Sequence, residues 1–533
     1  MNDSTLLHDL LFRSVQDNSS AVALTYGESS LSYGELGVAT LRFSNGIRGC
    51  GLARGERVAI YLEKRFETVI ASFGTPAAGG VFVPLNPLLK AEQVAYILRD
   101  CNVRILITSS QRLSLLRDIL PECHDLRHVV VVDTLSAPDP IQGIELGTWE
   151  NLLNAPPANG HRLIDTDVVS ILYTSGSTGK PKGVVLSHRN MVAGAKSVSS
   201  YLQNHPGDTL LAALPLSFDA GFSQLTTAFH VGARVVLLNY LLPRDVLKAL
   251  EREKVTGLTA VPPLYIQLTQ LEWPSCITEH LRYFANTGGR MPRETLDALR
   301  RHLPKSKPFL MYGLTEAFRS TYLPPEEADR RPDSIGKAIP NAEILVLRED
   351  GSPCAPNEPG ELVHRGALVG MGYWNDPEKT AERYKPLPST APGREAGLIL
   401  QEIAVFSGDT VRMDEEGFLY FIGRRDEMMK TSGYRVSPTE VEEILYATKM
   451  VGECVAFGVD DERLGQAIQV IITPPATHTD VDIAALLAEC RTRMPAYMVP
   501  SGIEVRNGPL PRNPNGKIDR KTLATTWVEQ NQQ

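Results

Sequence analysis

Residues 173–183, which read YTSGSTGKPKG, contain the residue types that bind a chain of phosphate groups. Six consecutive Thr, Ser and Gly residues offer hydroxyl groups and closely spaced backbone N–H groups, and two lysines add positive charge. The common nucleotide-binding P-loop differs, because it has a longer interval between its glycines and a Ser or Thr after its lysine. We expect a phosphate-binding loop between a buried strand and a helix. Its candidate contacts are Thr174, Ser175, Gly176, Ser177, Thr178, Gly179, Lys180 and Lys182.

The amino-acid composition is typical of a globular protein. It has 533 residues, 43% of them hydrophobic, and a net charge of −8, so we expect about three or four structural units. The acidic balance argues against a nucleic-acid partner. Seven widely spaced cysteines without a CxxC pair argue against a zinc site or a disulfide framework. The chain shows no secretory signal, and its longest uncharged stretch, 68–89, is broken by Gly and Pro. We therefore predict a soluble, cytoplasmic protein with no membrane partner.

The elements that must position this loop are indicated by hydrophobic patterning. Strand candidates alternate with helix candidates, which predicts parallel sheets with right-handed crossovers. The strand candidates are 57–61, 104–108, 128–132, 168–173, 233–238 and 257–260, and the helix candidates include 91–100 and 243–253. From 336 to 422, short strands with turn signals favour an antiparallel sheet or barrel. A small α+β pattern follows, in which Ser437, Pro438 and Glu440 predict a capping box at the start of a helix.

Residues 173–183 resemble the phosphate loop of the adenylate-forming superfamily, which contains acyl-CoA and aryl-CoA synthetases, nonribosomal-peptide adenylation enzymes and luciferases. Seven further motifs stand in family order, so the resemblance covers nearly the whole chain. They are 31–36 (LSYGEL), 76–85 (PAAGGVFVPL), 312–316 (YGLTE), 407–410 (SGDT), 423–426 (GRRD), 430–435 (KTSGYR) and 515–519 (NGKID). The resemblance implies an α/β fold with a large N-terminal core (1–425) of two parallel-type α/β subdomains plus a β-barrel-like subdomain. It also implies a small mobile α+β C-terminal domain (426–533).

The resemblance implies a role for individual residues. Lys517 matches the catalytic lysine, which would stabilise the charge that builds at the α-phosphate of ATP. Thr315 and Glu316 would act beside it, with Glu316 holding Mg²⁺. The nucleotide would contact Gly288, Gly289, Tyr312, Asp409 and Arg424, with Tyr312 stacked on adenine and Asp409 on the ribose. Asp426 matches the hinge of the mobile domain, and Gly433 lies where a tunnel would admit a phosphopantetheine thiol.

Substrate choice is expected within 214–225 (LPLSFDAGFSQL). In amino-acid-activating relatives, an Asp at the position of Asp219 pairs with the substrate ammonium group. Arg319 could instead neutralise Asp219, because a buried carboxylate needs a cationic partner. Leu314 stands where peptide-synthetase domains usually have Pro, which is more typical of acyl-CoA ligases. The candidate substrate contacts are Phe218, Asp219, Ser223, Ala260, Met311 and Arg319.

The sequence therefore predicts an ATP-dependent, AMP-forming ligase with ATP and Mg²⁺ as cofactors. It would activate a small amino acid, proline among the candidates, and transfer it to the phosphopantetheine thiol of a free-standing carrier protein. The alternative is an acyl- or aryl-CoA synthetase that uses free coenzyme A. Two further hypotheses are an inactive nucleotide sensor, which intact Lys517, Glu316 and Asp409 oppose, and a luciferase-type oxygenase, which only the shared fold supports.

Overall fold

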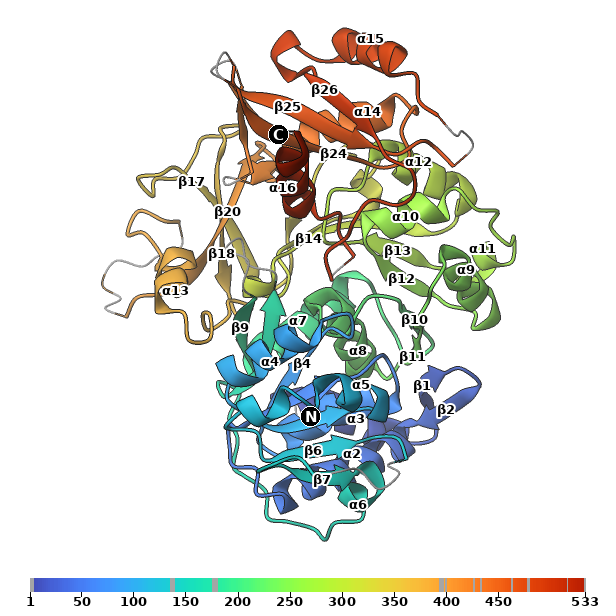
Figure 1. Ribbon diagram of the computed structural model, residues 1–533, viewed down its shortest axis with the longest axis vertical. Coiled ribbons are helices and arrows are strands. Elements are labelled where there is room, and N and C mark those ends of the chain that lie inside the picture. The colour runs from blue at the N-terminus through green and yellow to red at the C-terminus, as the bar shows by residue number, and fades with distance from the viewer. Residues whose placement is uncertain are drawn as a thin grey trace.

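The computed structural model describes residues 4–134, 140–174, 181–392, 397, 400–424, 427–431, 434–461, 464–476, 480–514 and 516–531. The architecture is mixed α/β (Figure 1), with the N-terminal sheet at the bottom of the view and the orange-to-red C-terminal segment at the top. Within the described residues all seven cysteines have free thiols, as predicted. Every helix of the described part is too short or too polar to cross a lipid bilayer.

The first sheet has seven strands in the order β7-β6-β5-β3-β4-β8-β9. Their bounds are β3 Arg57–Tyr61, β4 Val81–Pro84, β5 Val103–Thr108, β6 His128–Val131, β7 Glu145–Thr148, β8 Val168–Thr174 and β9 Lys182–Ser187. Neighbouring strands are parallel except for β9, which pairs antiparallel with β8. The predicted strand–loop–helix order around 173–183 is therefore wrong. The run of apolar residues after Gly183 pairs with β8 as an edge strand, and the helix α7 begins only at His188.

The second sheet has nine strands in the order β16-β15-β14-β13-β12-β10-β11-β1-β2. Their bounds are β1 Val22–Tyr26, β2 Ser29–Ser32, β10 Thr209–Ala212, β11 Arg234–Leu237, β12 Gly257–Ala260, β13 Tyr283–Asn286, β14 Lys307–Tyr312, β15 Thr321–Leu323 and β16 Lys337–Ala338. The interior pairs from β14 to β1 are parallel, as predicted. The edge strands β2, β15 and β16 pair antiparallel with their neighbours, and a tight turn connects β1 to β2.

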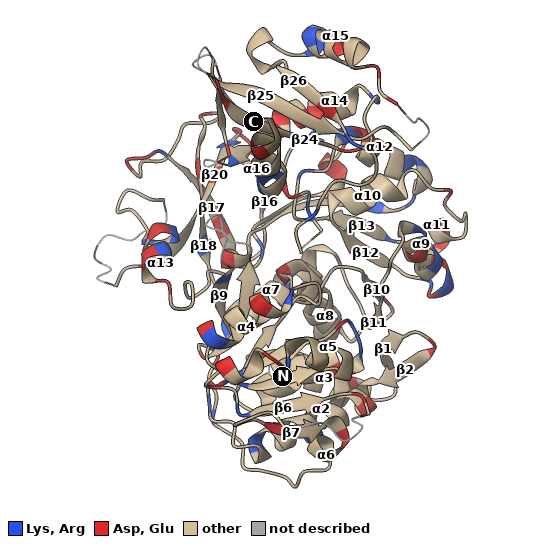
Figure 2. Cartoon of the chain, viewed as in Figure 1, with Lys and Arg blue, Asp and Glu red and all other residues tan. Residues whose placement is uncertain are grey.

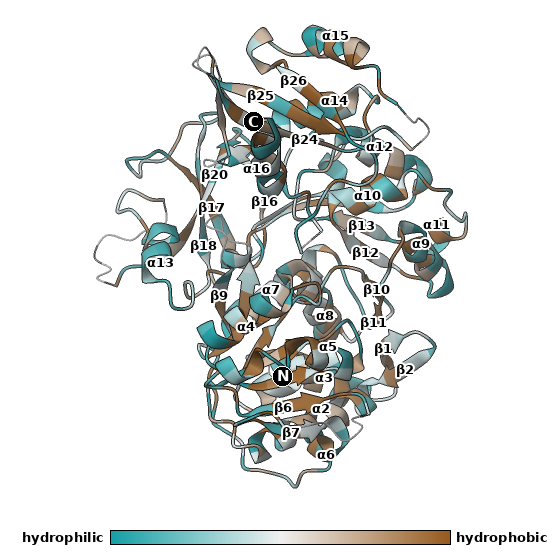
Figure 3. Ribbon diagram, in the orientation of Figure 1, coloured by the Kyte–Doolittle hydropathy of each residue, from teal (hydrophilic) through white to brown (hydrophobic). Residues whose placement is uncertain are grey.

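Both large sheets are buried on both faces, and Figure 3 shows their strands mainly brown. Along β3, Val58 and Ile60 enter the core between the sheets while Ala59 and Tyr61 enter the core on the opposite face. This alternation explains why the strands read as continuous apolar runs. The core between the sheets contains helix α3 (Phe66–Ala77) and helix α8 (Asp219–Val231), whose rings Phe73 and Phe222 stack 5.7 Å apart.

The remaining helices cover the outer faces or fill the space between sheets. Figure 2 shows charged residues in blue and red on peripheral helices such as α9, α13 and α15. The helices are α1 Leu7–Asp17, α2 Tyr33–Gly49, α4 Ala91–Asp100, α5 Ser110–Leu116, α6 Trp149–Leu153, α7 His188–Tyr201, α9 Pro243–Arg252, α10 Pro262–Leu268, α11 Ile277–His280, α12 Arg293–His302, α13 Pro377–Arg383, α14 Pro438–Ala447, α15 Ile483–Arg493 and α16 Arg520–Asn531. The predicted helices 91–100 and 243–253 thus correspond to α4 and α9.

Two smaller sheets complete the chain. The antiparallel sheet predicted within 336–422 contains β17 Ala342–Leu347, β18 Gly360–Gly366, β19 Tyr384–Pro386, β20 Ile403–Met413 and β21 Leu419–Arg424. The C-terminal sheet contains β22 Met429–Thr431, β23 Tyr434–Val436, β24 Cys454–Asp461, β25 Gly465–Ile472 and β26 Gly502–Val505. Ser437 caps α14 as predicted, but its hydroxyl accepts the N–H of Thr439 at 3.2 Å and not that of Glu440, so the predicted capping box is wrong.

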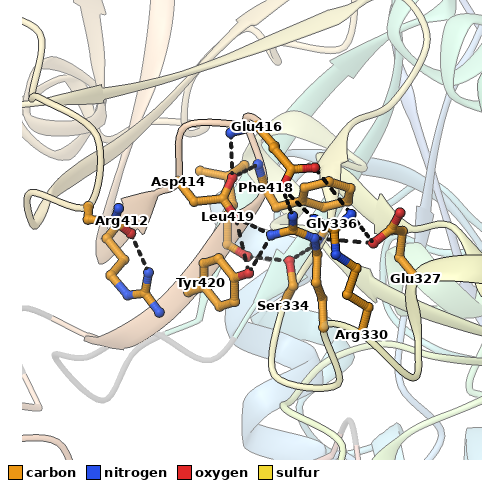
Figure 4. A network of polar contacts seen from close by, with 12 residues as sticks. Glu327, Arg330, Ser334, Gly336, Arg412, Asp414, Glu416, Phe418, Leu419 and Tyr420 are labelled. Carbon is orange, nitrogen blue, oxygen red and sulfur yellow. Dashed lines mark hydrogen bonds and ion pairs between the residues drawn. The ribbon is translucent and has the colours of Figure 1, made fainter.

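A polar network joins the antiparallel sheet to the edge of the nine-stranded sheet (Figure 4). Arg331 forms ion pairs with Glu327, Asp414 and Glu416 and donates to the Tyr420 hydroxyl at 3.0 Å. Its guanidinium also lies over the ring of Phe418, 4.1 Å from the centroid. Since Asp414, Glu416 and Phe418 lie between β20 and β21, this network joins the β20–β21 turn to the segment that connects β15 and β16.

The start of α8 depends on a glycine. A Cβ atom on Gly221 would lie 1.9 Å from the carbonyl oxygen of Pro215. We expect Gly221→Ala to lower the free energy of unfolding by about 1–3 kcal/mol, because the backbone of the preceding loop must move. Gly49→Ala at the end of α2 is the control, because its Cβ would meet only Ala155, at 3.9 Å. That change should be neutral or stabilising by up to about 1 kcal/mol. Equal urea midpoints for the two variants would contradict this packing account.

Candidate active site

The nine-stranded sheet brings several predicted site residues to one edge. Ala260, Met311 and Tyr312 lie at or next to the carboxyl ends of the parallel strands β12 and β14, and Asn286 ends β13 between them. The Asn286 side chain accepts the N–H of Met311 at 3.3 Å. Ligands of open α/β sheets bind beyond the carboxyl ends of their strands. The topology therefore places a binding site at this edge.

Lys517 reaches this edge from the C-terminal part of the chain. It lies in the turn before α16, where its N–H donates to the Asn513 side chain at 3.1 Å. The side chain of Asn86, in the seven-stranded half, donates to the carbonyl oxygen of Pro514 at 2.6 Å and docks this turn. A Cβ on Gly288 would lie 2.9 Å from Cε of Lys517, so the lysine passes directly over that glycine.

Burial lowers the pKa of Lys517, and the negative charge of Asp219 opposes that shift most strongly. Asp409 and Glu427 act in the same direction as Asp219, whereas Arg424 adds to the lowering. The lysine thus lies within electrostatic reach of both predicted substrate and nucleotide residues. Gly288 has a φ of +77°, which a residue with a side chain rarely adopts. The close approach of Lys517 gives a second reason for glycine at this position.

A second group joins β14 to β20 and β21. The hydroxyl of Tyr312 donates to Oδ2 of Asp409 at 2.5 Å, and Nε of Arg424 lies 3.4 Å from Oδ1 of the same carboxylate. Burial raises the pKa of Asp409, and the positive charge of Arg424 opposes that shift. Asp409 and Arg424 face each other in the β20–β21 register. Three residues predicted to bind a nucleotide are therefore in direct contact.

Glu316 and Lys182 meet at Tyr373. The Tyr373 hydroxyl donates to Oε1 of Glu316 at 2.6 Å, and Nζ of Lys182 lies 5.6 Å from the centroid of the same ring. Thr315 and Glu316 form a short 3₁₀ turn after β14. Within the described residues, Thr174 and Lys182 pair across β8 and β9, so the phosphate-loop strands end near the Glu316 carboxylate.

Asp219 is paired with Arg319 inside the protein. Nη1 of Arg319 lies 3.2 Å from Oδ2 of Asp219, and the side chains are only 3% and 4% exposed. Burial raises the pKa of Asp219, and the charge of Arg319 opposes that shift most strongly. Asp219 also begins α8, where the helix dipole favours a negative charge. The sequence suggested two partners for Asp219, a substrate ammonium group and the guanidinium of Arg319. In the structure, Asp219 pairs with Arg319.

The other predicted substrate residues are also buried. Ser223 lies one turn after Asp219 on α8. Phe218 and Ala260 share the apolar core on one face of the nine-stranded sheet, whereas Met311 belongs to the core on the other face. The hydroxyl of Tyr201 donates to Sδ of Met311 at 3.0 Å. The predictions for 175–180, Asp426 and Gly433 lie outside the described residues.

The sequence analysis missed residues that hold the C-terminal domain against the site. Arg290 forms ion pairs with Asp333, at 3.0 Å, and with Glu443 of α14. Lys449 lies 3.1 Å from Glu294 of α12. Arg290 directly follows Gly288 and Gly289. Its position next to these predicted nucleotide contacts is the sequence feature that could have identified it as a site residue. Because the Glu443 pair joins distant segments, no local pattern could reveal it.

Comparison with known proteins identifies the family. The family model "AMP-binding enzyme" matches residues 11–374, and "AMP-binding enzyme C-terminal domain" matches residues 440–517. The chain belongs to this family of AMP-forming ligases. The predicted family, fold class and enzyme class are confirmed. The model match to 440–517 includes Lys517.

Relatives of two kinds are similar to the chain. Feruloyl-CoA synthase of Amycolatopsis sp is 31% identical over 508 residues, which cover 93% of this chain and 94% of that one. Tyrocidine synthase 3 of Brevibacillus parabrevis is 29% identical over 523 residues, which cover 97% of this chain but only 8% of that much longer protein. The chain likewise spans 8% of bacitracin synthase 3 of Bacillus licheniformis, to which it is 27% identical over 97% of its own length.

Solved structures agree with the fold. The anthranilate CoA ligase AuaEII in complex with anthranoyl-AMP has a TM-score of 0.86 and 25% identity, with 98% of this chain and 97% of that chain covered. ATP-bound MatB from Rhodopseudomonas palustris has a TM-score of 0.85 and 24% identity, with 98% and 99% covered. The second match describes the fold alone.

Glu443 makes the contact between the domains sensitive to pH. Burial raises its pKa to about 7 from an ordinary value of 4.5, although Arg290 opposes the shift. Between these values the folded protein holds a proton that the unfolded chain releases, so wild-type stability should fall as pH rises from about 4.5 to 7. Relative to wild type, Glu443→Gln should gain on the order of 3 kcal/mol across that window.

Denaturation curves at several pH values between 4.5 and 8 measure this difference. Glu489→Gln on the exposed part of α15 is the control and should follow wild type throughout. Parallel stability profiles for Glu443→Gln and wild type would show that the Glu443 carboxyl does not titrate in this range.

Proposed function

We propose that this ligase joins a carboxylic acid to AMP and then transfers the acyl group to a phosphopantetheine thiol. The placement of Lys517 over Gly288, beside Asp219 and Asp409, is the observation that carries the proposal. It brings a cation from the C-terminal domain to the edge where the nucleotide residues gather. We place the boundary between the two domains at Asp426, so that 426–533 moves as one body.

The nucleotide residues fit ATP. Oδ1 of Asp409 is buried and has no hydrogen-bond partner within the described part of the chain, so it can accept a ribose hydroxyl. Tyr312 would stack on adenine, Gly288 and Gly289 would let the base approach the backbone, and Arg424 would contact ribose or phosphate. The phosphate contacts would come from Thr174, the 175–180 segment and Lys182.

A magnesium ion would be shared between the protein and ATP. The described residues contain no cluster of three or more His, Cys, Asp or Glu side chains that could hold a metal alone. Glu316 and Thr315 offer hard oxygen ligands near the end of β9, and Mg²⁺ is commonly held by one or two protein oxygens plus phosphates. When bound, the ion would neutralise charge on the departing pyrophosphate.

The chemistry runs in two half-reactions. In the first, a substrate carboxylate oxygen attacks the α-phosphorus of ATP, the bond to the bridging oxygen breaks, and pyrophosphate leaves. The Lys517 ammonium group would stabilise the negative charge that develops there. In the second, a thiolate attacks the acyl carbonyl carbon, the bond to the AMP oxygen breaks, and AMP leaves. Removal of Lys517 by rotation of the C-terminal domain would open the path for the thiol.

The Asp219–Arg319 pair bears on the substrate. An amino acid such as proline would need Asp219 as the counter-charge of its ammonium group, but Arg319 already neutralises that carboxylate. This pairing favours the alternative of an acyl- or aryl-CoA synthetase over transfer of an amino acid to a carrier protein. The acceptor chemistry, a phosphopantetheine thiol, is the same in both cases. Transfer assays with coenzyme A and with a phosphopantetheinylated carrier protein would show which of these two molecules supplies the thiol.

Lys517→Ala tests the assignment of the catalytic cation. We expect adenylate formation to fall about 10²–10³-fold, equivalent to roughly 3–4 kcal/mol of barrier, because the charge at phosphorus loses its partner. Thioester formation from a supplied acyl-adenylate should be largely preserved. Lys521→Ala, on the exposed side of α16, is the matched control and should leave both half-reactions unchanged. An equal loss in both half-reactions would rule out the proposed removal of Lys517 before thiol transfer.

Asp426→Pro and Gly433→Leu test the movement and the thiol path. Proline fixes φ at the proposed hinge, and leucine would fill the proposed tunnel. Both variants should form the adenylate at nearly the wild-type rate while thioester formation falls at least tenfold. Stopped-flow transfer assays measure the second step separately. Rapid transfer in both variants would refute the hinge and tunnel assignments.

A further inference from the structure

We propose that the Asp219–Arg319 pair recognises an uncharged polar group on the acyl chain, one that donates and accepts a hydrogen bond at once. A hydroxyl or an amide has this property. The inference rests on the proposed function and narrows its substrate class. It predicts selection against both an ammonium-bearing acid and a plain hydrocarbon acid.

The pair presents two complementary hydrogen-bonding atoms. Nη1 of Arg319 donates to Oδ2 of Asp219 and to the carbonyl oxygen of Phe318, each at 3.2 Å. Oδ1 of Asp219 and Nε of Arg319 are buried and have no partner among the residues that the structure describes. One is an acceptor and the other a donor. Buried polar atoms are nearly always hydrogen-bonded, so a ligand that satisfies both is the simplest reason for their arrangement.

The pair also lies within electrostatic reach of the proposed reaction centre. The charges acting on Asp219 include those of Arg319, Lys517 and Glu316. Lys517 would contact the substrate carboxylate, so a group on the acyl chain would come next to Asp219. The acyl chain of the substrate, and not the nucleotide, is therefore the ligand that these two atoms would contact.

Both side chains project from a constrained backbone. Phe318 has a φ of +55°, and a Cβ on Gly194 of α7 would lie 2.3 Å from its ring. A Cβ on Gly313 would similarly lie 3.2 Å from the Arg319 Cα atom. Asp219 is the first residue of α8. A pair held this firmly cannot easily rearrange, so it would discriminate between substrates by their own hydrogen-bonding groups.

The charge of the pair decides what it rejects. Because the pair is already neutral, an added ammonium group would leave a buried positive charge without compensation. A second carboxylate would meet the negative charge of Asp219. A hydrocarbon chain would leave Oδ1 and Nε unsatisfied, and sites built to bind a polar group strongly reject the analogue that lacks it. A neutral donor–acceptor group satisfies both atoms without adding charge.

Matched substrates test the proposal in an ATP–pyrophosphate exchange assay. Each set contains acids of one carbon skeleton that carry hydrogen, hydroxyl, acetamido or ammonium at one position, and the position is varied along straight-chain and aryl acids. In at least one set, wild type should favour the hydroxyl or acetamido acid over the other two by tenfold or more in kcat/KM. Preference for the ammonium acid, or equal rates throughout every set, would overturn the proposal.

Paired substitutions separate recognition from folding. The double variant Asp219→Leu with Arg319→Met removes both charges together, so neither is left buried alone. It should reverse the preference toward the hydrocarbon acid by tenfold or more while retaining the wild-type melting temperature or exceeding it. The variant Asp219→Asn with Arg319→Gln keeps an uncharged donor and acceptor and should retain the wild-type order. An unchanged order in the Leu/Met variant would overturn the proposal, as would a loss of preference in the Asn/Gln variant.

Two controls complete the design. Arg282 and Asp208 form another ion pair, in which Asp208 is buried and Arg282 half-buried, with 2.6 Å between Nη2 and Oδ2. Arg282→Gln with Asp208→Asn should lower stability without changing the substrate order. Lys517→Ala should lower exchange equally for all acids of a set. Exchange without discrimination contradicts this inference alone, whereas no exchange with any acid contradicts the proposed function and the inference with it.

Discussion

The rest of this structure depends on one constraint. A lysine side chain must lie over a glycine at the place where two domains meet. Lys517 belongs to the C-terminal segment, yet its side chain passes over Gly288 of the N-terminal core. A buried cation requires nearby negative charge. Asp219, Asp409 and Glu427 provide it, and they come from three separate parts of the chain. The fold must therefore bring these segments together before any chemistry is possible.

Among the described residues, polar pairs contribute to this contact, and such pairs would suit the opening of the interface proposed above. Asn86 holds the turn that carries Lys517, while Arg290 and Lys449 pair with carboxylates across the domains. Pairs of this kind add little free energy when they are exposed to solvent. An extensive apolar interface would instead keep the domains together permanently. Burial raises the pKa of Glu443 in this contact to about 7, although the charge of Arg290 opposes the shift.

The Asp219–Arg319 pair shows that a single partner residue changes which substrate a motif is expected to bind. By itself, Asp219 matches the ammonium anchor of amino-acid-activating relatives. With Arg319 at 3.2 Å the site has no net charge at this point, but among the described residues it retains one unsatisfied acceptor and one unsatisfied donor. The same carboxylate that would bind an amino acid becomes part of a neutral polar surface. Under the proposal made above, substrate class depends on the pair and not on either residue alone.

The sequence by itself determined the family and the positions of the main parallel strands, and it predicted Lys517 as the catalytic lysine, because motifs and apolar periodicity are local properties of the chain. Tertiary structure alone decided the partner of Asp219, which lies 100 residues away, and the contact between Arg290 and Glu443. It also decided that residues 182–187 form a strand, since an apolar run joins a sheet only if a neighbouring strand offers an edge. Pairings between distant residues follow from how the elements pack, and no local pattern records that packing.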